Sequence, residues 1–121
     1  MDERELIIME TIEEIQTLSF TIILHAGNAR SHAMAAISLA KDYKFTEARN
    51  KIEEAEQEFI EAHRFQTKLI QTEARGSKND VTVILVHAQD HLMTAMTVKD
   101  LANEMIYMYE KMKVIEERVK K

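Results

Sequence analysis

Two histidines and an aspartate in the last third of the chain have the types and the spacing to do chemistry. They are His87, Asp90 and His91, and they lie within the octet HAQDHLMT. On an α-helix the offsets i, i+3 and i+4 place three side chains on one face. Imidazole acts near neutral pH as a nucleophile, a base or a metal ligand, so this face is the candidate site.

The composition predicts that long helices position this face. The chain has 121 residues, no proline, two glycines and only 6% aromatic residues. Such a composition is typical of helices rather than of a sheet with many turns. The apolar period is interrupted twice, and the sequence therefore predicts one domain, residues 1–121, with helices at about 4–41, 45–75 and 80–119.

Polar residues at the two interruptions predict where the second and third helices begin. Thr46 follows the first interruption and is a candidate N-cap. Asn79 or Asp80 follows Gly76 and is the candidate N-cap of the third helix.

The third predicted helix is apolar on more than one face. One apolar stripe runs through Ala88, Ala95 and Ala102, and a polar seam between two apolar stripes runs from His87 through Leu101 to Met108. A helix that is apolar this far round is too buried for a solitary three-helix monomer. The pattern predicts that it packs against its own bundle on one side and a neighbouring subunit on the other.

Charge and composition exclude several classes of function. The net charge of −5 and pI of about 5.5 do not indicate a nucleic-acid binder. No stretch approaches the roughly 20 apolar residues of a membrane span, and the acidic start lacks the features of a secretory signal. We therefore expect a cytoplasmic protein without direct membrane insertion. The absence of cysteine rules out disulfides, cysteine catalysis and a thiolate metal site.

The spacing of the histidines leaves several functions open. A metal-binding bundle would need ligands beyond His87 and His91, such as His25, His63 or symmetry mates, and Ala88 stands where metalloprotease helices carry their glutamate. A nucleophilic His87 needs a free ring nitrogen and neighbours that hold its tautomer. Ordinary surface histidines, or a non-catalytic adaptor that binds a partner helix through a methionine-rich face, fit the spacing as well.

A family resemblance decides among these readings. The octet with the preceding Val83–Val86 resembles the active-site segment of the lactose/cellobiose-type IIA proteins of the bacterial sugar phosphotransferase system. Two further motifs follow the family's order: AGNARS at residues 26–31, and EAH at 61–63 followed by QTKLI at 66–70. The resemblance runs from about Glu10 to Lys113 and is stronger to the cellobiose and diacetylchitobiose branch than to the lactose branch.

The resemblance implies an activity and a role for each residue of the octet. His87 matches the histidine that accepts a phosphoryl group from HPr and passes it to a cysteine of the IIB component, during uptake of a β-glucoside-type disaccharide. Asp90 matches the carboxylate that binds a divalent cation, usually Mg²⁺, on the axis of a homotrimer. His91 and Gln89 match neighbours of the active imidazole. The implied fold is all-α, an antiparallel up-down-up three-helix bundle that assembles into a nine-helix homotrimer.

Two histidines outside the octet have less defined roles. His25 stands where the family often has Tyr, Asn or Ser, and we expect it to pack between helices. His63 recurs in the family, and we expect it to make a structural hydrogen bond.

Overall fold

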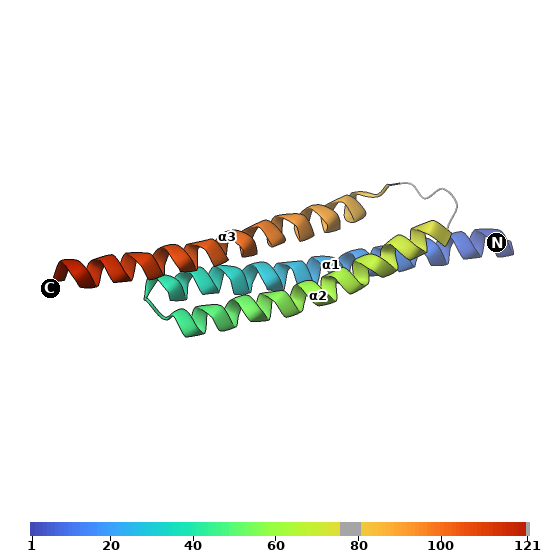
Figure 1. Cartoon of the computed structure of the whole chain (residues 1–121). Helices are drawn as coiled ribbons and strands as arrows, with labels where there is room; N and C mark the ends of the chain where they lie inside the picture. Colours follow the sequence, from blue (N-terminus) through green and yellow to red (C-terminus); the bar gives the residue numbers. More distant parts are fainter. Residues whose placement is uncertain (76–80, 121) are drawn as a thin grey trace.

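Three long helices make up the structure, a computed structural model that describes residues 1–75 and 81–120. They are α1 (Glu3–Lys41), α2 (Phe45–Arg75) and α3 (Val83–Lys120). The described residues contain no strand. The helices run up, down and up along a common direction, with the N-terminus and the C-terminus at opposite ends (Figure 1). The predicted all-α three-helix bundle is confirmed.

Helix α1 holds the bundle together. It contacts both α2 and α3 along much of its length, whereas α2 and α3 contact each other sparsely. In Figure 1 α3 accordingly lies along one side of the α1–α2 pair. One side of α3 is therefore left without cover from its own chain.

Alanines let the helices approach closely. Each helix carries buried alanines seven residues apart, a spacing that returns to the same face of a helix. Small side chains on such a face allow short distances between helix axes. The buried alanines with this spacing are Ala26, Ala33 and Ala40 in α1, Ala48, Ala55 and Ala62 in α2, and Ala88, Ala95 and Ala102 in α3.

The predicted N-cap of the second helix is wrong, and the third helix has a cap that the sequence did not predict. Helix α2 begins at Phe45, one residue before Thr46, and its first turn is closed by the Ala48 N–H donating to the Lys44 carbonyl at 2.9 Å. Helix α3 begins at Val83, and the Thr82 hydroxyl accepts from the Leu85 N–H at 3.2 Å. Thr82 is therefore the residue that caps α3, while the positions proposed for that cap, 79 and 80, lie outside the described residues.

The turn between α1 and α2 contains a left-handed residue that is not glycine. Tyr43 has φ of 61°, a conformation that costs a residue with a Cβ roughly 1–2 kcal/mol. Its ring stacks on Phe45 at 5.8 Å, and its hydroxyl donates to Glu116 at 2.6 Å. These contacts offset the backbone cost and join the turn to the C-terminal part of α3. The same hydrogen bond raises the pKa of Tyr43 and lowers the pKa of Glu116.

Helix α3 exposes an apolar stripe on the side away from its buried alanines. Its members recur at alternating steps of four and three residues, the pattern of a coiled-coil seam. The stripe comprises Leu101, Met105, Met108, Met112, Ile115 and Val119, all exposed in the single chain. No helix among the described residues has a stretch long and apolar enough to cross a bilayer.

Candidate functional site

His87 and His91 lie side by side on α3, as their spacing predicts. Their ring centroids are 5.7 Å apart and the ring planes differ by 19°. His87 is exposed, whereas His91 is half-buried towards α1. The pair thus presents one imidazole to solvent, supported by a second imidazole that the bundle holds in place.

Asp90 is exposed on the same outer side of α3. Within the described residues its carboxylate has neither a hydrogen bond nor an ion pair. No group of three or more histidine, aspartate or glutamate side chains in the described part of the chain could hold a metal ion. Within one copy, Asp90 therefore presents a lone carboxylate at the surface.

Gln89 points away from His87 within the chain. Its side-chain oxygen accepts from the Gln66 amide of α2 at 2.7 Å, so this side chain bridges α3 and α2. The physical reason is its spacing, because two helical residues turn the side chain by about 200°. Within a single copy the structure therefore brings His91, but not Gln89, next to the imidazole of His87. Gln66, which orients the Gln89 amide, belongs to the QTKLI motif.

Helix α1 contributes a glycine to the site. A Cβ placed on Gly27 would lie 3.5 Å from the Nε2 atom of His91, so the glycine faces that ring. The AGNARS motif on α1 and the octet on α3 meet at this contact, between residues 64 positions apart in the sequence. The sequence alone does not predict this pairing, because it depends on how far α1 and α3 are shifted along each other.

The remaining histidines lie outside this site. His25 is half-buried between α1 and α2, as expected: its Nδ1 lies 2.6 Å from Oε2 of Glu58, and its ring stacks on Phe65 at 5.7 Å. The imidazole of His63 is exposed and has no hydrogen-bond partner in the part of the chain that is described. The predicted structural hydrogen bond of His63 is therefore wrong, because the side chain points to solvent.

A charged contact below the histidines joins α3 to α2. The Lys99 ammonium donates to Glu56 of α2 and lies 3.1 Å from Asp100. The hydrogen bond to Glu56 raises the pKa of Lys99, in opposition to its partial desolvation. Together with the Gln66–Gln89 hydrogen bond, this contact ties two helices that otherwise touch little.

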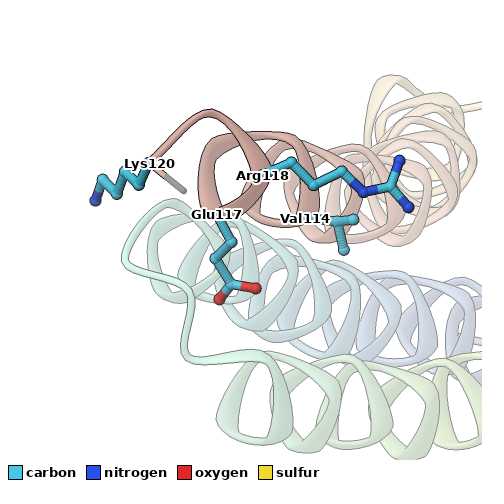
Figure 2. A pocket seen from close by; sticks show the side chains of 4 residues that line it. All are labelled: Val114, Glu117, Arg118 and Lys120. Atoms are coloured by element: carbon cyan, nitrogen blue, oxygen red, sulfur yellow. The ribbon is translucent and has the colours of Figure 1, made fainter.

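Neither of two surface hollows coincides with the histidine pair. One, of about 420 Å³, is lined by Val114, Glu117, Arg118 and Lys120, and Figure 2 shows Arg118 and Lys120 extending in opposite directions from the end of α3. At 1.5 Å per helical residue, Val114 lies roughly 40 Å from His87. The other hollow, of about 400 Å³, is an apolar groove lined by Met34, Ile37 and Lys41 of α1 and Val98, Leu101, Met105 and Tyr109 of α3.

Fold and site together define the class of protein. Residues 17–110 match the family described as "PTS system, Lactose/Cellobiose specific IIA subunit", where PTS denotes the sugar phosphotransferase system. A three-helix bundle with paired imidazoles on its third helix is thus a component of this phosphoryl-transfer system. The chain belongs to the lactose/cellobiose-specific IIA family, as its motifs predict.

Individual relatives support the same conclusion. The chain is 56% identical over 99 residues to the lichenan-specific phosphotransferase enzyme IIA component of Bacillus subtilis, which covers 82% of this chain and 90% of that protein. The crystal structure of the cellobiose-specific enzyme IIA from Bacillus anthracis superimposes with a TM-score of 0.78 at 50% identity, over 83% of this chain and 92% of that chain.

A third relative was solved together with a partner protein. It is the chitobiose IIA of Escherichia coli in complex with HPr, with a TM-score of 0.70 and 38% identity over 82% of this chain and 96% of that chain.

Proposed function

We propose that this chain is the phosphocarrier IIA component of a phosphotransferase system for a β-glucoside-type disaccharide of the cellobiose or chitobiose kind. His87 accepts a phosphoryl group from the phosphohistidine of HPr and donates it to a cysteine of the IIB component, in the cytoplasm. The observation that carries the proposal is the exposed imidazole of His87, stacked on His91, within a IIA-family bundle.

The chemistry requires little more than a positioned nucleophile. A lone pair on a ring nitrogen of His87 attacks phosphorus, and the new N–P bond forms as the N–P bond of phospho-HPr breaks. In the second transfer this bond breaks as the thiolate of IIB forms an S–P bond. Phosphoryl transfer has a loose transition state, so the protein mainly orients the groups and stabilises charge on the phosphoryl oxygens. The chain has no cysteine that could divert the group.

Two supports for the partner assignment are independent of each other. A relative with 38% sequence identity has been solved in complex with HPr, so a protein of this fold presents a surface that HPr recognises. The apolar residues Val83, Val86 and Met93 are exposed close to His87 along α3, and they offer contact area to a docking protein.

The homotrimer is part of the proposal. The exposed stripe on α3 has coiled-coil spacing, and the apolar groove between α1 and α3 lies beside it. In three copies related by a threefold axis, the stripe of each copy would pack against the stripes of the other two. Asp90 lies on the same side of α3, and three copies would bring three carboxylates together.

A cation would relieve the repulsion among these carboxylates. Oxygen ligands suit Mg²⁺, which keeps several waters and uses few protein ligands, so one carboxylate from each of three copies fits its chemistry. Asp90 would hold the ion, and the role of the ion would be to offset the repulsion among the three carboxylates rather than to enter the transfer between His87 and its partners.

The test is to phosphorylate the protein and map the modified residue. Incubation with phosphoenolpyruvate, enzyme I and HPr should label His87, and His87→Ala should abolish the label while the protein keeps its fold and oligomeric state. His63→Ala is the matched control, because it removes an exposed imidazole of α2 and should leave labelling unchanged. Label retained in His87→Ala, or lost in His63→Ala, would contradict the assignment.

A further inference from the structure

We propose that Gly27 of α1 is a positioning residue for phosphoryl transfer. It keeps the Nε2 atom of His91 open, so that this atom can donate a hydrogen bond to a phosphoryl oxygen on His87. The inference rests on the proposed function and extends the site from α3 to a second helix.

Within one chain, nothing in the structure of α1 requires a glycine at this position. Gly27 lies inside a helix, where alanine is more favourable, and its φ is not in the left-handed region. Outside its own helix backbone, a Cβ here would meet one described atom within 4 Å, Nε2 of His91, at an ordinary contact distance of 3.5 Å. Alanine would therefore fit, and the main local change would be to the surroundings of that nitrogen.

The Nε2 atom of His91 is available to a ligand. It has no hydrogen-bond partner among the described residues. A side-chain atom in that part of the chain that lacks a partner and is also shielded from solvent is Ser19 Oγ, and His91 Nε2 is not such an atom. It therefore keeps contact with solvent. A methyl group on residue 27 would occupy part of the space through which an oxygen atom reaches it.

His91 is correctly placed to serve the phosphoryl group. Side chains of a helix lean towards its N-terminus, so the His91 ring leans over the turn that carries His87, and the two rings stack at 5.7 Å. A ring N–H that donates to a phosphoryl oxygen stabilises the negative charge that the oxygens carry during transfer. Gly27 takes no part in bond making or breaking, and its effect passes entirely through His91.

The test is Gly27→Ala, measured in the full-length protein with phospho-HPr as donor. We expect its melting temperature to rise by about 3–5 °C, because helix propensity improves. We expect kcat for phosphorylation of His87 to fall about tenfold, the effect of weakening one hydrogen bond to a charged group, with little change in KM. A variant that is more stable yet slower would not be produced by a merely structural role.

A double-mutant cycle shows whether the effect passes through His91. His91→Ala alone should also lower kcat about tenfold, and adding Gly27→Ala to it should change kcat less than twofold. Asn50→Ala is the control, because it improves helix propensity at an exposed site on α2 and should leave kcat unchanged.

Other outcomes overturn the proposal without touching the proposed function. If Gly27→Ala transfers phosphate at the normal rate, or slows equally with and without His91, Gly27 does not position that ring. If Gly27→Ala dissociates the oligomer, the glycine serves contact between copies instead. Failure of the wild type to be labelled on His87 would refute the proposed function itself.

Discussion

Replacing Met108 by glutamate should dissociate the proposed trimer. Met108 is in the middle of the exposed stripe of α3 and leaves 63% of its surface exposed in the single chain. Fully burying a methionine side chain is worth about 1.5–3 kcal/mol, so association can still gain roughly 1–2 kcal/mol per copy. Over three copies this is about 3–6 kcal/mol, or a factor of about 10²–10⁴ in the trimerisation constant, at 1.4 kcal/mol per tenfold. Three glutamates facing one another add repulsion to this loss.

The measurement is sedimentation equilibrium across a range of protein concentrations, with circular dichroism to confirm that the helices remain. Because Met108 is mostly exposed, the isolated bundle should keep its helical signal. Tyr107→Glu is the matched control: the tyrosine is 54% exposed on the same helix but lies off the stripe. An unchanged trimer in Met108→Glu, or equal dissociation in Tyr107→Glu, would show that the stripe is not the contact between copies.

Three further predictions concern charge and packing. The hydrogen bond to Glu56 raises the pKa of Lys99, so the charged ammonium is favoured in the folded state. This contact stabilises the fold by about 1 kcal/mol. The stabilisation is complete below the unfolded pKa of 10.5 and is lost as pH rises through the folded pKa. Urea unfolding at pH 8–12 should therefore show wild type and Lys99→Met converging at the alkaline end, and a constant difference would refute the linkage. Asp90→Leu should keep the trimer and raise its melting temperature, because like charges near the axis are removed; sedimentation showing monomers would contradict an axial Asp90. His25→Ala should lower the free energy of unfolding by about 1–2 kcal/mol through loss of the Glu58 contact and the ring stacking, measured by urea denaturation, with phosphorylation of His87 retained.

Much of the fold and part of the site could be predicted from the amino-acid order alone. Helix periodicity and the near absence of glycine and proline predict three long helices, because hydrogen bonding within a helix is local. The pairing of His87 with His91 follows from the same geometry, since residues four apart lie on one face. The octet and its two companion motifs were specific enough to indicate the family. His25 packed between two helices, as expected of a half-apolar ring.

Only the tertiary structure decided which residues meet across helices. Gly27 faces His91, and Gln89 turns to Gln66 instead of His87, because the rotation and axial shift of each helix are set by close packing of alanines distributed over all three. No local pattern encodes those two quantities, which depend on the summed contacts of side chains far apart in the chain. The same packing leaves α2 and α3 with few contacts and one side of α3 uncovered, the physical basis for expecting partner copies there.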